Sequence, residues 1–237
     1  MITKLRNVGN TCFINSILQC LSIPELHEWF KTATKDSLLF NEYKDIQNMM
    51  VEYESIIPNR FVNIVYHQLH FTPRQQGDAH ELLLYLLDEM DCPLFKGKQI
   101  SHLSDTKIEE AFFSLEVPVM PTLEKSIQSY MKPEEVEWMN KKVLKWYEII
   151  QYPDLLWITL KRFDNQNNKN DELIQIPFEM GIYELIAICN HHGNTNYGHY
   201  TAMVKRDQWY ECNDEDIHPV TPTTRHAYCL LFRKKTV

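Results

Sequence analysis

The chain has 237 residues, 44% of them hydrophobic, which allows one large or two small domains with a substantial core and excludes a disordered tail. Its net charge of −8, from 24 basic and 32 acidic residues, disfavours nucleic acid as the main partner and is compatible with a basic protein partner. Neither a membrane-spanning apolar run nor an N-terminal signal peptide is recognisable, so we expect no membrane association and a cytoplasmic or nuclear location.

The cysteines are spread singly along the chain and form no C-x-x-C pair. This pattern argues against a secreted disulfide framework and against a zinc knuckle, and it indicates a reducing compartment. We therefore predict neither a metal site nor a cofactor. The six residues are Cys12, Cys20, Cys92, Cys189, Cys212 and Cys229.

The first predicted helix begins at Cys12, because apolar residues recur from there to Leu21 with helical spacing and Pro24 closes the run. Thr11 is expected to be its N-cap. Cys12 then lies in the first turn, where unpaired N–H groups and the helix dipole favour a thiolate and make a cysteine reactive. Alternatively, Cys12 is a buried structural cysteine.

Short amide side chains and a glycine precede this cysteine. Gly9 permits a tight backbone turn, and Asn7 and Asn10 supply N–H donors that suit an oxyanion forming near the sulfur. The segment is therefore typical of a nucleophile with its oxyanion site.

A second helix is predicted over residues 79–90, after a break at Thr72-Pro73-Arg74. Asp78 and Glu81 have the spacing of a capping box at its start. Alternatively, the two carboxylates bind an arginine of a partner through charge-assisted hydrogen bonds. Both interpretations require the same oxygen atoms.

Strands dominate the second half of the chain. Residues 124–150 look helical or mixed, and apolar runs of strand length surround them. Helices first and strands later indicate an α+β fold, with a helical lobe and an antiparallel sheet lobe. The predicted strands cover residues 112–119, 155–163, 183–189 and 228–233, with a hairpin of 200–205 and 208–212 around Asp207.

His199 is the favoured base for the Cys12 thiol. It follows Gly198 at the start of the predicted hairpin, whose far end brings Asn213 or Asp214 back beside it. The result is a Cys-His-Asn arrangement of the papain type. Alternatively, His199 is an ordinary core or surface histidine.

A second pair of histidines, His191 and His192, lies next to Cys189. A metal site there is disfavoured because no second group of ligands lies nearby in the sequence. A loop beside the cleft is the preferred interpretation.

These segments, in this order, resemble the ubiquitin-specific protease family of deubiquitinases. The resemblance runs from one end of the chain to the other. It is carried by a cysteine box at 7–21, a glutamine-acid-helix motif at 76–87, a strand at 155–163 ending in Leu160-Lys161-Arg162-Phe163, a histidine box at 191–204, and the segments 209–214 and 227–232.

The resemblance implies a single catalytic domain over residues 1–237 with a papain-like α+β fold. Its helical thumb would cover about residues 1–95 and its antiparallel β palm about 96–237. A zinc-binding fingers region is missing between Leu123 and Pro153, where the segment is short and holds no cysteine. Strongly reduced fingers near 123–152 are therefore expected.

The activity implied is hydrolysis of the peptide or isopeptide bond after the C-terminal Gly-Gly of ubiquitin. Cys12 would be the nucleophile, His199 the general base and acid, and Asn213 the orienting residue. Asn7 would form the oxyanion hole with the Cys12 N–H, and Asp214 would support the site.

The same resemblance assigns a set of substrate-binding residues. Asp78 and Glu81 would bind arginines near the ubiquitin tail, and Tyr200 would line the narrow channel for the glycines. Ubiquitin or ubiquitin-conjugated proteins would be the partners of a monomeric enzyme. The set is completed by Gln76, Gly198 and His191.

The chain departs from the family pattern at Phe13, Gly77 and Leu82, where tyrosine, glutamine or glutamate, and phenylalanine are usual. Phe13 and Leu82 keep an apolar side chain of similar bulk, so we expect little effect from these two changes. Two other functions stay open: a protease for a ubiquitin-like modifier, and an inactive module that only binds ubiquitin.

Overall fold

The computed structural model describes residues 2–164, 166, 168–194 and 197–235. The chain forms two compact units, each made from two stretches of sequence. The first unit contains the chain up to Met90 together with Ile186–Ala227, and the second contains Asp91–Leu185 together with the residues from Tyr228 onward. None of the helices in these ranges is long and apolar enough to cross a membrane.

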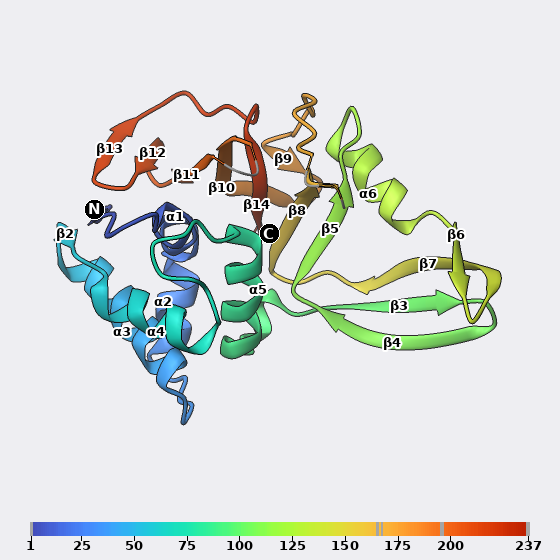
Figure 1. Ribbon diagram of the computed structural model, residues 1–237, viewed down its shortest axis with the longest axis horizontal. Helices are drawn as coiled ribbons and strands as arrows, with labels where there is room; N and C mark the ends of the chain where they lie inside the picture. Colours follow the sequence, from blue (N-terminus) through green and yellow to red (C-terminus); the bar gives the residue numbers. More distant parts are fainter. Residues whose placement is uncertain (1, 165, 167, 195–196, 236–237) are drawn as a thin grey trace. The chain divides into compact units, whose positions relative to one another are not determined.

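Five helices precede the four-stranded ladder of the first unit (Figure 1). All ten residues of the helix that begins at Cys12 are buried, so it is the central helix of this unit. A short parallel pair of strands, β1 (Lys4–Leu5) and β2 (Ser55–Ile56), joins the N-terminal segment to the helices. The helices are α1 (Cys12–Leu21), α2 (Pro24–Phe30), α3 (Leu38–Glu52), α4 (Asn59–Gln68) and α5 (Ala79–Met90).

The two helices expected from apolar spacing are both present, as α1 and α5. Pro24 follows α1 as predicted, but it also begins α2, because proline suits the first turn of a helix. Thr11 lies at the N-cap position of α1, but its hydroxyl caps no N–H of that helix. It accepts a hydrogen bond from the backbone N–H of Val8 instead, at 3.0 Å, so Thr11 is the N-cap as predicted but caps no helical N–H with its side chain.

The strands of the first unit form an antiparallel ladder in the order β10, β11, β12, β13. The predicted hairpin is confirmed as β11 and β12, which pair Ala202 with Cys212 and Lys205 with Trp209. The central helix α1 packs against β11 and β12. The four strands are β10 (Tyr183–Gly193), β11 (Gly198–Lys205), β12 (Trp209–Asn213) and β13 (Asp216–Pro219).

The second unit contains a separate antiparallel sheet in the order β4, β3, β7, β6. Its long strands β3, β4 and β7 lie side by side (Figure 1). We expected only a remnant near 123–152, but the sheet also takes in residues 97–112. The strand pattern of that hairpin is weak because β4 has six exposed residues. The strands are β3 (Gly97–Leu103), β4 (Thr106–Phe112), β6 (Glu134–Trp138) and β7 (Lys141–Gln151).

Stacked rings pack both faces of this sheet. His102 stacks on Trp146 with ring centroids 4.4 Å apart, and Tyr130 stacks on Tyr147 at 4.8 Å. The Tyr130 hydroxyl also donates to Gln99 at 2.8 Å.

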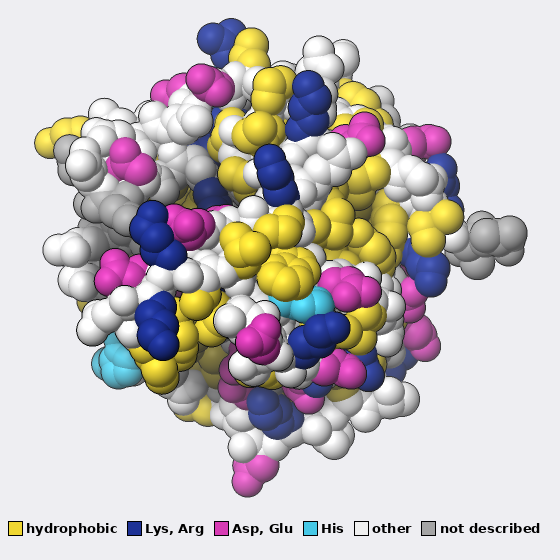
Figure 2. All heavy atoms as spheres, turned by 90° about the vertical axis from the view of Figure 1, so that its right-hand side faces the viewer, with side chains coloured by type: hydrophobic (Ala, Val, Ile, Leu, Met, Phe, Trp, Pro, Cys, Tyr) yellow, Lys and Arg dark blue, Asp and Glu magenta, His cyan; other side chains and the backbone are white. Residues whose placement is uncertain are grey.

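Hydrophobic side chains gather on the face of the molecule shown in Figure 2. Exposed apolar residues of this sheet and its turns are Ile108, Trp138, Met139, Leu144 and Ile150.

The remaining elements of the second unit include the strands that the sequence predicted near residues 112–119, 155–163 and 228–233, together with two helices. Strand β8 pairs with β5 in parallel and with β14 in antiparallel fashion. A short pair of β9 with the start of β10 extends this region. The elements are η1 (Pro93–Phe95), β5 (Ser114–Pro118), α6 (Leu123–Met131), β8 (Leu155–Lys161), β9 (Glu179–Met180) and β14 (Ala227–Lys234).

Arg162 anchors the end of β8 from inside the second unit. Its side chain is 2% exposed, and its guanidinium donates to the carbonyls of Asn170 and Glu172 at 2.9 and 3.1 Å. Burial lowers the pKa of this guanidinium. A buried charge needs such partners because it has lost its water. The arginine therefore holds the loop that follows β8.

Replacing Arg162 by Met should lower the free energy of unfolding by about 2–4 kcal/mol, because two carbonyls lose a charged donor. Urea unfolding followed by tryptophan fluorescence measures the change. The neighbouring exposed Lys161→Ala is the control and should stay within about 0.5 kcal/mol of the wild type. Equal urea midpoints for Arg162→Met and the wild type would contradict this anchoring role.

Candidate active site

The turn before α1 places Cys12 at the first position of that helix. Gly9 and Asn10 both have positive φ, of 120° and 55°, which produces the tight turn expected from the glycine. The side-chain oxygen of Asn7 accepts hydrogen bonds from the N–H groups of Gly9 and Thr11 at 3.0 and 3.2 Å. The Asn7 side chain thus holds the turn that presents the cysteine, which is only 4% exposed.

His199 lies beside Cys12 and Asn213, as the sequence predicts. Its Nε2 is 2.7 Å from the side-chain oxygen of Asn213, and its interaction with the Cys12 thiol raises the pKa of the ring. Because an amide oxygen only accepts, Nε2 carries a proton toward Asn213 and Nδ1 is left for the sulfur. The β11–β12 hairpin brings the histidine and the asparagine together.

The electrostatic environment favours a charged His199. The hydrogen bond to Cys12 is the main cause that raises the pKa of His199 to about 9, against partial burial, which lowers it. The bond to Asn213 and the negative charges of Cys12 and Asp214 raise it further. At neutral pH the ring therefore keeps its proton.

Asp214 connects three parts of the site. Its two carboxylate oxygens accept hydrogen bonds from the side-chain amides of Asn7 at 3.0 Å and Asn15 at 2.8 Å. Its backbone carbonyl accepts from the N–H of Leu5 at 3.2 Å. The residue itself has φ of 54°, in the turn directly after Asn213. Asp214 therefore ties the N-terminal segment and α1 to the hairpin that carries the orienting residue.

Asp78 caps α5, as the capping-box interpretation predicts. One carboxylate oxygen accepts from the N–H groups of His80 and Glu81 at 2.7 and 3.0 Å. Glu81 is exposed in the first turn of α5. The structural role of Asp78 is thus confirmed, whereas binding of an arginine by Asp78 and Glu81 stays a prediction.

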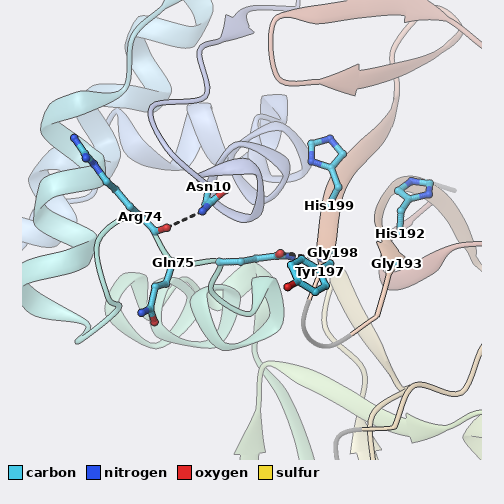
Figure 3. A pocket seen from close by; sticks show the side chains of 9 residues that line it. Asn10, Arg74, Gln75, His192, Gly193, Tyr197, Gly198 and His199 are labelled. Carbon is cyan, nitrogen blue, oxygen red and sulfur yellow. Dashed lines mark hydrogen bonds between the residues drawn. The ribbon is translucent and has the colours of Figure 1, made fainter.

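A groove of about 820 Å³ adjoins His199 and lies within the first unit (Figure 3). Gln76 and Gly198, predicted to bind substrate, both line it. The backbone N–H of Gly198 donates to the side-chain oxygen of Gln76 at 3.2 Å. The lining residues are Asn10, Arg74, Gln75, Gln76, His192, Gly193, Tyr197, Gly198 and His199.

Tyr200 and His191 lie inside the first unit and do not line this groove. Each is 3% exposed, and their rings contact each other with centroids 4.7 Å apart. Residues of β11 alternate between faces, which places Tyr200 on the face opposite to its neighbour His199. Direct substrate contacts for Tyr200 and His191 stay a prediction.

Three features of the site were not recognised in the sequence. Asn15 is buried within α1, and its partner in the second half of the chain has no local sequence signal. Asn10 donates one side-chain N–H to the carbonyl of Arg74 at 2.6 Å and so holds the groove wall, while its role as an oxyanion donor stays a prediction (Figure 3). The third feature is Gly77, whose lack of a side chain is explained by the aromatic rings packed around it.

Gly77 is required by a close aromatic contact. A Cβ at this position would lie 2.7 Å from the rings of both Phe13 and Phe71. These two rings pack with centroids 5.3 Å apart. The glycine at this unusual position therefore makes room for the aromatic residue that follows the nucleophile.

Comparisons with known proteins identify the family of this chain. The family model described as "Ubiquitin carboxyl-terminal hydrolase" matches residues 3–232. Human ubiquitin carboxyl-terminal hydrolase 42 is 27% identical over 96% of this chain and 22% of its own length. Hydrolase 25 of Arabidopsis thaliana is 25% identical over 97% of this chain and 47% of its own length. Hydrolase 8 of Saccharomyces cerevisiae is 23% identical over 100% of this chain and 71% of its own length.

The solved structure of the SAGA DUB module, Ubp8 with Sgf11, Sus1 and Sgf73 bound to monoubiquitin, has the same fold. It matches with a TM-score of 0.79 at 21% identity, over 100% of this chain and 70% of that chain. The predicted α+β fold of a ubiquitin-specific protease is therefore confirmed. The chain spans less than half the length of the human and Arabidopsis relatives. It belongs to the ubiquitin carboxyl-terminal hydrolase family.

Proposed function

We propose that the chain is a cysteine-dependent deubiquitinase that hydrolyses the peptide or isopeptide bond after the C-terminal Gly-Gly of ubiquitin. The connected set of Cys12, His199 and Asn213 at the start of a buried helix carries this proposal. Membership of the family and the ubiquitin named with the solved neighbour support the choice of substrate. We propose that it acts as a monomer in the cytoplasm or nucleus.

Attack begins with the Cys12 thiolate, which the charged His199 ring stabilises. The sulfur adds to the carbonyl carbon of the terminal glycine and forms a tetrahedral oxyanion. The Cys12 N–H lies at the N-terminus of α1, where it has no partner within the helix. An amide has two N–H groups, and Asn7 uses one for Asp214, so its second N–H is left to donate to the oxyanion.

The tetrahedral intermediate collapses when His199 donates its proton to the leaving lysine amine. A thioester between ubiquitin and Cys12 remains, and the ring is now neutral. Water then attacks the thioester while His199 accepts a proton, which releases ubiquitin and restores the charged ring. Asn213 keeps Nε2 in place through both steps.

The groove beside His199 suits the extended tail of ubiquitin, because it opens directly onto the histidine. The acidic side chains of Asp78 and Glu81 lie close in sequence to the groove residue Gln76 and favour a basic tail. A modifier whose tail lacks arginine would lose this attraction. We therefore favour ubiquitin over ubiquitin-like modifiers.

Labelling with a ubiquitin probe that carries an electrophilic C-terminus should produce one covalent adduct, at Cys12. Cys12→Ala should abolish the adduct and isopeptide cleavage, because the nucleophile is lost. Intact mass spectrometry and peptide mapping locate the adduct. Cys20→Ala, at a buried cysteine of the same helix, is the control and should still be labelled. Binding of ubiquitin by folded wild-type protein without any adduct would indicate the inactive module instead.

The rate of isopeptide cleavage should fall as the pH rises through about 9, where His199 loses the proton that it donates to the amine. Asn213→Ala should move this alkaline limb to lower pH, because the bond to Asn213 raises the pKa of His199. The dependence of kcat on pH, measured with ubiquitin joined to a fluorescent lysine peptide, tests both statements. An alkaline limb that stays in place in Asn213→Ala would contradict the role of Asn213.

Asp214→Ala should lower kcat by about 10²-fold, as loss of an oxyanion donor does, since Asp214 acts through Asn7. Asn7→Ala should have a similar effect, and the double variant should be little worse than either single one. The neighbouring Glu215→Ala is the control, because Glu215 contacts only exposed Arg6 at 3.8 Å among the ion pairs of the described residues. Fully additive losses of kcat would show that the two residues act separately.

A further inference from the structure

Gln76 contacts the backbone directly before the predicted catalytic base. Its side-chain oxygen accepts the hydrogen bond from the Gly198 N–H at 3.2 Å, and the next residue is His199. A Cβ at Gly198 would lie 2.8 Å from the Gln76 amide nitrogen and 2.3 Å from His191 Nε2. Gly198 is therefore enclosed by two side chains, and the chain there has little freedom to shift.

The strand pairing leaves this position with few other supports. Strand β12 pairs with β11 only from Ala202 to Lys205. At Gly198 and His199, β11 pairs with Gly193 and His192 of β10, the last residues of that ladder. The hydrogen bond from Gln76 thus supplements the strand pairing at the end of the hairpin, one residue before the ring that must face both Cys12 and Asn213.

We propose that Gln76 is a positioning residue for His199, in addition to lining the groove. Its bond to Gly198 fixes the position of the β11 backbone at the start of the strand. It thereby keeps the His199 imidazole between the Cys12 sulfur and the Asn213 oxygen. This inference rests on the proposed deubiquitinase function, and it assigns Gln76 a role in the chemical step and not only in substrate binding.

The size of the effect follows from the geometry of proton transfer. A shift of about 1 Å in a catalytic group can cost about 10²-fold in rate. The Gln76 side chain is exposed, so loss of its bond should change the free energy of unfolding little. A substitution of Gln76 can therefore change kcat through the position of His199 without a large change in the free energy of unfolding.

Gln76→Met, which keeps the length but removes the acceptor, should lower kcat about tenfold or more and change KM less than about threefold. Gln76→Glu keeps an acceptor oxygen and should restore most of kcat. The matched control is Gln68→Met, at an exposed glutamine at the end of α4 that does not line the groove. It should leave kcat close to that of the wild type. A rise in KM alone for Gln76→Met would overturn the proposal.

A second measurement needs no ubiquitin. The rate at which iodoacetamide alkylates Cys12, followed by peptide mass spectrometry across pH 5–10, reports the thiolate that His199 stabilises. In Gln76→Met the rate at neutral pH should fall and the profile should shift to higher pH, whereas Gln76→Glu and Gln68→Met should follow the wild type. Identical profiles for Gln76→Met and the wild type overturn the proposal. A shifted profile in a protein that cleaves no ubiquitin substrate supports positioning and contradicts the proposed function alone.

Discussion

The carboxylate of Asp214 is the connection on which the arrangement of this site depends. It accepts hydrogen bonds from Asn7 and Asn15, which lie 207 and 199 positions away in the sequence. Both partners belong to the N-terminal segment and helix that present the cysteine. Because Asp214 directly follows Asn213, the same turn fixes the orienting residue and the predicted oxyanion donor. Movement of either half of the site would break a charge-assisted hydrogen bond.

His199 lies between these two halves, and groups of both halves raise its pKa and so favour the protonated ring. The bond to Cys12 raises its pKa more than partial burial lowers it, and Asn213 and Asp214 add to the increase. The protonated ring can therefore serve first as the partner of a thiolate and then as an acid. The site forms within one compact unit, since Cys12, Asn213 and Gln76 all belong to the first one.

Aromatic side chains stabilise the four-stranded sheet of the second unit. Two pairs of stacked rings, His102 with Trp146 and Tyr130 with Tyr147, pack against its strands. In the part of the chain that the structure describes, no group of three or more His, Cys, Asp or Glu side chains could hold a metal ion. Aromatic stacking contributes about 0.5–1.5 kcal/mol per pair beyond burial, so these two pairs add to the stability of the sheet.

The sequence by itself determined the local elements and predicted the identity of the reacting groups. Apolar spacing located α1 and α5, alternation located the β11–β12 hairpin, and residue type singled out Cys12, His199 and Asn213. These signals are readable because each depends on neighbours only a few positions away. Only the tertiary structure decided which distant groups meet: Asp214 with Asn15, and Gln76 with Gly198. It also decided that Tyr200 and His191 are buried, because burial depends on what packs over a strand and not on the strand's own pattern.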